Sequence, residues 1–432
     1  MRQTRRQADI TWLLGPAKNY YGQWAQAAVL FLSLGLIPYW AVSAEAPTFQ
    51  QLLQQSLSNA PALLEQAAHV RAASGDAQQA RAWLNPSISA VSENIGGNQS
   101  GGINQRQDTY TVTQPIDLGG KRIARIEAGE RVLAAVQARS QQAQITFSAK
   151  LAVAYATAEA MQLRKDIAGE ELMRAKDDLL VAEALVKAGR EAELRVVQAQ
   201  SSVASAQATE QAAIADAIEA MERLSALVGA KESYTSIAHP FLIGASGYRP
   251  ELMATSADAP AVITAVAERE AWSAQAGLEE KRWFPDIGLS VGLRKFSGTG
   301  DNTMLIGISA SIPLFDRNSG AIAAARERVT VAEARLEITR LEAKAEKRSA
   351  TAQLSAADMR VKGAILGEST AAEAYRLGRI GYNAGKTSLL ELLMIRRTLN
   401  DAKLLTIDAH LARIRALALL SIADGRMAFG EK

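Results

Sequence analysis

The chain has 432 residues, enough for two or three ordinary domains, with a formal net charge of +3 and no cysteine. The missing cysteine excludes a disulfide framework, a thiolate metal site, a cysteine nucleophile and a lipidated N-terminal cysteine. Basic and acidic residues are interleaved, so no basic face predicts nucleic-acid binding. A mean hydropathy of -0.04 excludes a bundle of membrane helices.

Residues 1–44 are predicted to be a secretory signal peptide. Basic residues precede the apolar run 25–37, and the small-residue stretch 41–44 follows it. An apolar core of about 13 residues is too short to span a membrane, and cleavage after Ala44 satisfies the small-residue rule. The alternative is an uncleaved N-terminal membrane anchor, but we expect export.

The rest of the chain is predicted to be an internal duplication. Landmarks of the first half recur in the second at an offset of about 198 residues. The pairs are Pro61 and Pro260, Pro86 and Pro285, Pro115 and Pro313, Trp83 and Trp283, and Gly189 and Gly385. The predicted organisation is a first repeat (45–228), a linker or equatorial segment (229–258), a second repeat (259–424) and a C-terminal tail (425–432).

Each repeat is predicted to contain very long helices. No proline occurs in residues 116–239 or in residues 314–432. A continuous helix over about 121–187 would be roughly 100 Å long, which no compact domain of this size needs. An ordinary antiparallel coiled coil and a wall of helices both remain open at this point.

The heptad pattern of the first long helix favours the wall. Leu172, Leu179 and Val186 repeat every seven residues, while Met173 and Leu180 follow one step around the helix. Apolar residues on more than one face indicate neighbours on two sides.

Four runs with period-two alternation are predicted to be strands, two in each repeat. They cover about 87–95, 108–115, 286–296 and 303–312. In the third run Ile287, Leu289, Val291 and Leu293 alternate with small or polar residues. Bulky apolar residues on one face and small polar residues on the other are typical of a transmembrane barrel. A half-buried soluble hairpin gives the same alternation, so a single run would be weak evidence.

Strand counting then predicts an assembly. Two hairpins supply four strands, whereas the smallest closed membrane barrel has about eight. Open sheet edges are not tolerated in hydrocarbon, so several chains must share one barrel. Two copies would contribute eight strands in all and three copies twelve. Three copies are favoured because the wider barrel leaves a lumen.

Three stretches carry a resemblance to a known family. They are Gln114-Pro-Ile-Asp-Leu-Gly-Gly-Lys-Arg122, Ile312-Pro-Leu-Phe-Asp-Arg-Asn-Ser-Gly320 and Tyr382-x-x-Gly385-Lys-Thr-Ser-Leu-Leu-Glu-Leu-Leu393. With these residues the chain resembles the TolC-type outer-membrane efflux factor family, and it looks most like members that serve cobalt–zinc–cadmium type metal export.

The resemblance implies a mainly α fold with a small transmembrane β part. It implies a homotrimer with a twelve-strand barrel in the outer membrane of a Gram-negative bacterium, in contact with its lipid. An α-helical tunnel would extend from the barrel into the periplasm. The implied partners are a periplasmic adaptor and an inner-membrane pump of the resistance–nodulation–division class, and the implied cargo is divalent heavy-metal cations.

The tips of the helical hairpins are the predicted functional site. Gly189 and Gly385 are expected to be helix C-caps where each long helix reverses into the next. With the basic residues that follow them, Arg190 and Lys386, they mark the turns at which the resemblance places adaptor docking.

The resemblance also implies an acidic constriction of the tunnel just after the second turn. Glu391 fits this position, and Tyr382 fits the gate tyrosine of the family. Met394 stands where the family often has a second acidic residue. Arg195 is the first-repeat counterpart of Glu391 and carries the opposite charge, so it is expected to link the two hairpins. Solvated surface charge is the alternative for Glu391 and Arg195.

No other chemistry is indicated. The sequence has no Gly-rich phosphate loop and no His-Glu-x-x-His motif. His69, His239 and His410 fall in different segments without ligand spacing. We therefore expect no enzyme activity, no cofactor and no metal site. The open alternatives are an outer-membrane duct for drugs or secreted proteins and, from another class, a periplasmic coiled-coil adaptor or scaffold protein.

Overall fold

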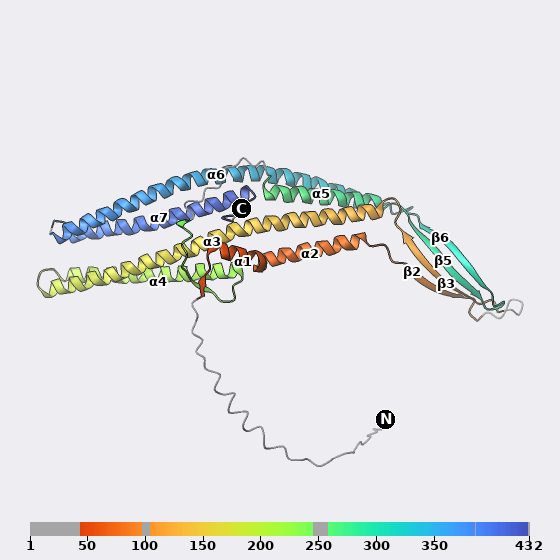
Figure 1. The fold of residues 1–432 in the computed structure, drawn as a ribbon, viewed down its shortest axis with the longest axis horizontal. Coiled ribbons are helices and arrows are strands. Elements are labelled where there is room, and N and C mark those ends of the chain that lie inside the picture. Colours follow the sequence, from red (N-terminus) through yellow and green to blue (C-terminus); the bar gives the residue numbers. More distant parts are fainter. Residues whose placement is uncertain (1–43, 97–103, 245–257, 385, 431–432) are drawn as a thin grey trace, which may run out of the picture. The chain divides into compact units, whose positions relative to one another are not determined.

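The computed structural model describes residues 44–96, 104–244, 258–384 and 386–430. The predicted signal peptide lies outside the described residues apart from Ala44. The helices are α1 (Phe49–Asn59), α2 (Pro61–Arg81), α3 (Lys121–Lys187), α4 (Leu194–Val228), α5 (Pro260–Lys281), α6 (Ser319–Asn383) and α7 (Leu389–Ala423). The strands are β1 (Ala44–Ala46), β2 (Ser87–Glu93), β3 (Gln107–Ile116), β4 (Tyr234–Ile237), β5 (Asp286–Phe296) and β6 (Asn302–Ser311). Figure 1 labels the helices and the strands β2, β3, β5 and β6 along the chain.

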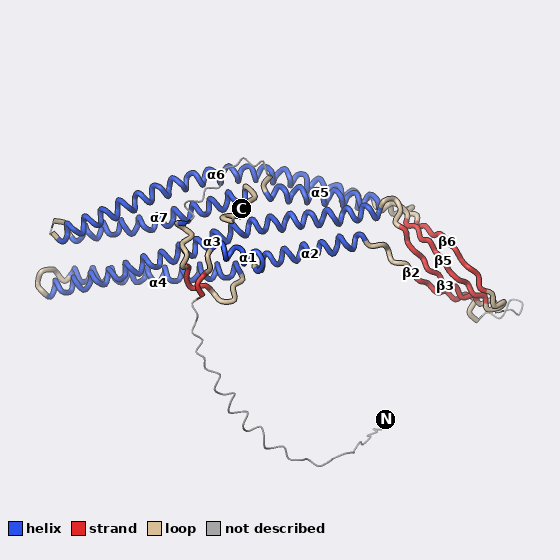
Figure 2. Tube along the Cα trace, viewed as in Figure 1, coloured by secondary structure: helices blue, strands red, loops and turns tan. Residues whose placement is uncertain are grey.

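Two long helices, α3 with 67 residues and α6 with 65, run the length of the helical part. Toward the strands, α3 packs between α2 and α5, and α5 also contacts α6. Away from the strands, α3 packs between α4 and α7, and α7 also contacts α6. Figure 2 shows these antiparallel neighbours. The prediction that α3 has neighbours on two sides is confirmed. Among the described residues, no helix combines the length and apolar character that crossing a membrane requires.

The duplication is visible at two matching contacts, in each of which the end of one helix meets the start of another. Pro61 and Pro260 occupy the first turns of α2 and α5, where a missing N–H costs nothing. Gly229, after α4, has a φ of +72°, and a Cβ there would lie 2.7 Å from Pro61 Cδ. Gly425, after α7, has a φ of +70° and approaches Pro260 in the same way. In each repeat a helix end therefore closes onto the proline that opens α2 or α5.

The main hydrophobic core lies at the middle of the helical part. Its centre is an aromatic cluster in which Phe49 stacks on Phe241 with ring centroids 4.5 Å apart. Tyr155 of α3 and Phe429 of the C-terminal segment meet Phe241 edge to face. Helix α1, the segment after α7 and the linker between the repeats are thereby packed against α3.

A buried carboxylate ties the linker to α3. Glu159 is 6% exposed, and its Oε2 accepts hydrogen bonds from the backbone N–H groups of Phe241 (2.9 Å) and Leu242 (2.8 Å). Burial raises the pKa of Glu159, while the two N–H donors act in the opposite direction. The carboxylate thus replaces water for two backbone groups that the core would otherwise leave unsatisfied.

Glu159→Ala is expected to lower the free energy of unfolding by about 2–4 kcal/mol, because it leaves two buried donors without an acceptor. Glu222, whose Oε2 accepts from Ser233 Oγ at the surface, provides the control. Glu222→Ala should change the value by less than about 0.5 kcal/mol. Denaturant unfolding of the detergent-purified protein measures both. Equal losses in the two variants would contradict a special role for Glu159.

Strands β1 and β4 pair in parallel, and the other four strands form one antiparallel sheet in the order β2-β3-β5-β6. The two hairpins join through β3 and β5, which pair Val112 with Val291, and β5 pairs Leu289 with Ile308 on β6. Strands β2 and β6 each have one side without a partner strand in this sheet. The two repeats therefore contribute one hairpin each to a single curved surface.

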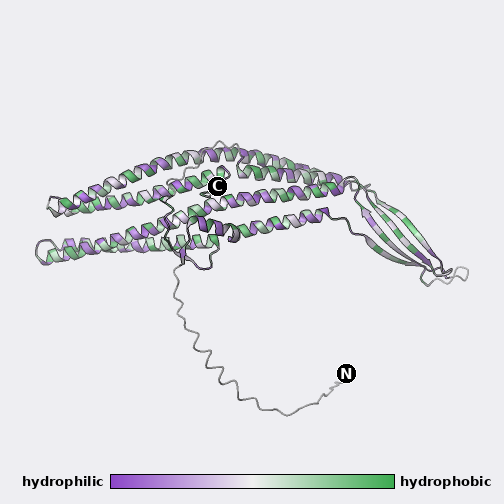
Figure 3. Cartoon of the chain, viewed as in Figure 1, coloured by the Kyte–Doolittle hydropathy of each residue, from purple (hydrophilic) through white to green (hydrophobic). Residues whose placement is uncertain are grey.

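The two faces of the sheet differ in the size and polarity of their side chains, as the alternation predicts. The outer face carries large apolar side chains that are widely exposed, such as Ile306 and Ile308, both 74% exposed. Figure 3 shows hydrophobic residues recurring along these strands. On the inner face a Cβ added to Gly292 would lie 2.5 Å from a backbone oxygen of β3, and one added to Gly307 would lie 2.6 Å from Ser290 Oγ. The inner face is therefore closely packed at these glycines: a side chain at Gly292 would collide with the backbone of β3, and one at Gly307 would have to displace the Ser290 hydroxyl.

Candidate functional site

Two turns connect helices at the end away from the sheet, and the first of them joins α3 to α4. Gly189 has a φ of +68°, and its N–H donates to Val186 O at 3.0 Å. The N–H of Arg190 donates to Leu185 O at 3.0 Å. This pair of bonds is the Schellman arrangement, which satisfies the last carbonyls of a helix and needs a left-handed residue. Gly189 therefore lies where the sequence predicts the reversal.

The second turn, between α6 and α7, is held by different contacts. Lys386 N–H donates to Gly381 O at 2.8 Å, and a Cβ on Gly381 would lie 2.3 Å from Thr387 Oγ1. Ser388 caps α7, because its hydroxyl accepts from the backbone N–H of Glu391 at 3.3 Å. Glu391 thus lies in the first turn of α7, where the helix dipole favours a carboxylate. Gly385 lies outside the described residues.

The predicted constriction residues are distributed over both turns. Glu391 is exposed, and Tyr382 is half-buried near the end of α6. Arg195, also half-buried, places its Nε 4.0 Å from Glu191 Oε2, an ion pair within its own hairpin. Arg190 and Lys386 are exposed in the two turns. Within one chain, the ion pair of Arg195 is therefore with Glu191 and does not reach Glu391.

Polar contacts between α3 and α7 link the two hairpins instead. Arg396 Nη1 lies 2.8 Å from Asp178 Oδ2, and its Nη2 lies 3.2 Å from Glu171 Oε1. Asn400 Nδ2 donates to Glu171 Oε2 at 2.5 Å. We call the set the α3–α7 ladder. Its members are Arg164 with Asp408, Glu170 with Lys403, Glu171 with Arg396 and Asn400, and Asp178 with Arg396.

Arg396 is the most shielded charged member of the ladder. Its side chain is 13% exposed, against 31% for Glu171 and 38% for Asp178. One guanidinium thus bridges two carboxylates of α3 that lie two turns apart on one side of the helix. Such partly buried pairs are less screened than surface pairs, and removing one partner leaves the other charge uncompensated.

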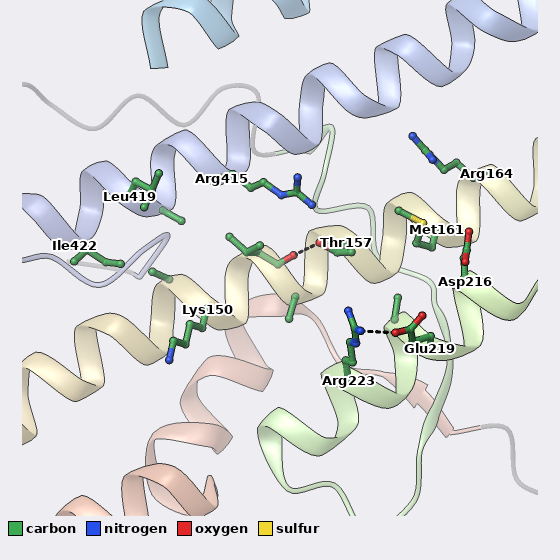
Figure 4. A pocket seen from close by; sticks show the side chains of 15 residues that line it. Lys150, Thr157, Met161, Arg164, Asp216, Glu219, Arg223, Arg415, Leu419 and Ile422 are labelled. Carbon is green, nitrogen blue, oxygen red and sulfur yellow. Dashed lines mark hydrogen bonds and ion pairs between the residues drawn. The ribbon is translucent and has the colours of Figure 1, made fainter. Parts of the chain in front are cut away.

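The helices α3, α4 and α7 also line a series of grooves. The first, near the middle of the helical part, has a volume of about 760 Å³ and is drawn in Figure 4. Lys150 and Thr157 of α3 and Arg415 of α7 border it, and α4 contributes the ion pair between Glu219 and Arg223.

Another groove, nearer the turns, has a volume of about 720 Å³. Arg195 of α4 and Met394 of α7 both line it, together with Arg396. The structure therefore brings Arg195 and Met394 to one surface, whereas Glu391 is not among the residues that line this groove.

A search of protein families matches two segments of the chain, residues 52–230 and 254–426, to the family described as outer membrane efflux protein. The chain belongs to this family. The two matched segments correspond to the two halves of the duplicated fold, and the predicted resemblance is confirmed.

The alignments with curated relatives cover nearly the whole efflux protein. It is 52% identical over 404 residues to the nickel-cobalt-cadmium resistance protein NccC of Alcaligenes xylosoxydans xylosoxydans, covering 94% of this chain and 91% of the relative. It is 55% identical over 389 residues to the nickel and cobalt resistance protein CnrC of Cupriavidus metallidurans, covering 90% and 93%. Identity to the cobalt-zinc-cadmium resistance protein CzcC of the same organism is 27% over 380 residues, covering 85% and 88%.

Solved structures match the fold. The outer membrane channel CmeC of Campylobacter jejuni superposes with a TM-score of 0.74 at 15% identity, covering 89% of this chain and 87% of that one. CusC superposes with a TM-score of 0.73 at 18% identity, covering 89% and 94%. The predicted fold class, mainly helical with a small β part, is confirmed.

Sequence reasoning missed the α3–α7 ladder of this efflux protein, although a signal was present. Arg164, Glu171 and Asp178 are spaced by seven residues, so they occupy one heptad position of α3. Arg396 and Asn400 are four apart on α7 and also share a face. Each set alone is typical of a solvent-exposed helix face. The contact between the two sets is evident only when α3 and α7 are placed side by side. Within the described residues, no group of three or more His, Asp or Glu side chains is arranged to hold a metal ion.

Proposed function

We propose that this chain is the outer-membrane duct of a tripartite efflux system that exports divalent heavy-metal cations. An inner-membrane pump of the resistance–nodulation–division class would supply the cations through a periplasmic adaptor. The observation that carries the proposal is the likeness to NccC and CnrC, whose names state nickel and cobalt resistance and which match at 52% and 55% identity.

A resistance assay tests the proposed cargo. Deleting the gene in its host should lower the tolerated nickel and cobalt concentrations and raise the cell content of both metals, and the intact gene should restore them. A hydrophobic drug and a secreted protein serve as comparison cargoes. Unchanged metal tolerance with impaired drug efflux or protein secretion would favour one of these other ducts.

The sheet supports a shared barrel. Four strands cannot close a membrane barrel, and the outer sides of β2 and β6 are available for the sheets of other copies. The crowded inner face, with glycine at its closest contacts, gives the sheet the curvature that closure needs. Three copies would supply twelve strands and a lumen lined by Gly, Ser and Thr.

A detergent-stable trimer is therefore expected. Native mass spectrometry of the purified protein should show one species of three chains that survives dilution, because dissociation would expose six strand edges to hydrocarbon. A monodisperse monomer in detergent would contradict the shared barrel. Release of the protein by osmotic shock without detergent would instead favour a periplasmic scaffold.

We further propose that the helical tips form a closed gate. Glu391 would face the tunnel axis in three copies, and the three carboxylates would concentrate cations there. Tyr382 and Arg195 would help to hold neighbouring helices. Gly189, Arg190, Gly385 and Lys386 at the turns would contact the adaptor, which the exposed basic side chains of Arg190 and Lys386 support.

Planar-bilayer recordings test the gate residues. Glu391→Ala is expected to weaken cation selectivity, because it removes the carboxylate from the proposed axis. Arg195→Glu is expected to raise the open fraction by up to about fivefold, since it removes a cation that would hold neighbouring helices, and an ion pair of such exposure is worth about 0–1 kcal/mol. If neither quantity changes, both residues are ordinary surface charges.

A further inference from the structure

The two outer edges of the sheet carry exposed apolar side chains at their helical ends. After β6 come Ile312, Leu314 and Phe315, whose exposed fractions are 67%, 65% and 100%. Just before β2 lies Trp83, 70% exposed, and at the start of β2 lies Ile88, 81% exposed. A cluster of large apolar side chains in contact with water marks a surface that another molecule covers.

The equivalent segments inside the chain already cover each other. Strands β3 and β5 pair, so the segment after β3 lies against the segment before β5. The contact is close, since a Cβ on Gly119 would lie 2.3 Å from the ring of Phe284. Asp117, which lies 198 positions before Phe315, has a side chain that is only 11% exposed. The two repeats thus have matching segments, of which one pair is covered within the chain and the other is not.

A shared barrel would create the same junction a second time, between copies. The β6 edge of one copy would meet the β2 edge of the next, as β3 meets β5 inside the chain. The internal junction includes an ion pair, with Lys121 Nζ 2.6 Å from Asp286 Oδ1. The duplication places Ser319 and Ser87 at the corresponding positions. The junction between copies therefore lacks this ion pair and depends on its apolar side chains.

The large aromatic ring also comes from the opposite strand end. Inside the chain, Phe284 follows Trp283 in the segment before β5. In the segment before β2, the smaller Leu84 follows Trp83, and the ring is supplied by Phe315 after β6. One aromatic side chain beside the tryptophan is thus present at both junctions, and it is missing from the outer edge of β2 only while the chain is alone.

We propose that Phe315 of one copy packs against residues 83–88 of the next copy and forms an apolar seal where the barrel meets the helical tunnel. The inference rests on the shared barrel of the proposed function. Trp83 is available for this contact, because its ring remains largely exposed although the guanidinium of Arg122 lies 4.8 Å from the ring centre. The seal would close the seam between copies at the end of the sheet nearest the helices.

Photocrosslinking in native membranes tests the contact. Cells produce two versions of the chain with different affinity tags, and only one version carries p-benzoylphenylalanine in place of Phe315. Illumination should give an adduct with both tags, joined through the tryptic peptide 82–106 of the version without the probe. The matched control carries the same probe in place of Phe284. It should join to the tryptic peptide 107–121 of its own chain, because Phe284 packs on Gly119.

Trimer lifetime gives a second measurement. Phe315→Ala should shorten the lifetime of the trimer in warm detergent by about tenfold, because it removes a large apolar side chain from each seam. Phe315→Leu keeps an apolar group and should keep most of the lifetime. Met173→Ala is the control and should leave the lifetime unchanged. Met173 is 61% exposed, but it lies on α3, which has neighbours on two sides within one chain.

The outcomes separate the seal from the duct. An adduct of the Phe315 probe with lipid, with its own chain or with another segment of the neighbouring copy would overturn the seal and leave a trimeric duct intact. An unchanged lifetime in Phe315→Ala would do the same. Single-tag adducts from both probes, together with a monomer in native mass spectrometry, would overturn the shared barrel and the seal with it.

Discussion

Leu289→Asp and Ile308→Asp are expected to abolish assembly in the membrane, whereas Ser290→Asp and Ser309→Asp are expected to be tolerated. Leu289 and Ile308 form a pair on the apolar face of the sheet, and Ile308 is 74% exposed in the single chain. In a shared barrel this face meets lipid. A charge near the bilayer midplane costs about 2–4 kcal/mol, with aspartate toward the lower end, and three copies multiply the cost.

The serine variants are matched controls on the same two strands. Ser290 leans over Gly307, and Ser309 leans over Gly288, so the missing side chains leave room for a slightly larger group. Both positions would face water in the lumen. Heat-modifiability on gels, together with membrane fractionation, measures assembly of all four variants. Equal behaviour of the two pairs would show that the face assignment, or the barrel itself, is wrong.

Arg396→Ala is expected to open the helical tip. The substitution removes the guanidinium between Glu171 and Asp178 and leaves the two carboxylates of α3 facing an apolar methyl group on α7. Allowing for the partial exposure of both acids, we expect a loss of about 1–2 kcal/mol from the contact between the hairpins. That corresponds to a factor of about 5–30 in the balance between closed and open tips.

Conductance in planar bilayers measures this balance. Arg397, the next residue on α7, is exposed and forms no part of the ladder, so Arg397→Ala is the matched control. A double variant, Arg396→Glu with Glu171→Arg, should restore part of the closed state because it reverses one pair. The proposal fails if Arg396→Ala and Arg397→Ala conduct alike, since the ladder would then only stabilise the fold.

Most of the architecture of this protein follows from local signals in the sequence. The proline-free stretch after Pro115 predicts a helix over about 121–187, and α3 spans Lys121–Lys187. Period-two alternation identifies which residues of β5 and β6 share a face, because successive side chains of a strand point to opposite sides. Gly189 marks a helix reversal because only glycine adopts a positive φ without strain.

Only the tertiary structure decided which polar groups meet. Arg396 and Asp178 are 218 positions apart, and Glu159 binds backbone groups 82 and 83 positions away. Local periodicity assigns a residue to a face of its own helix, but the register between two helices is set by the packing of all their side chains. Arg195 is the counterexample on the local side. Its ion pair is with Glu191, only four positions earlier in the chain. Which charged residues link the hairpins therefore depends on the axial register of α7 against α3. No single segment of the sequence encodes that register.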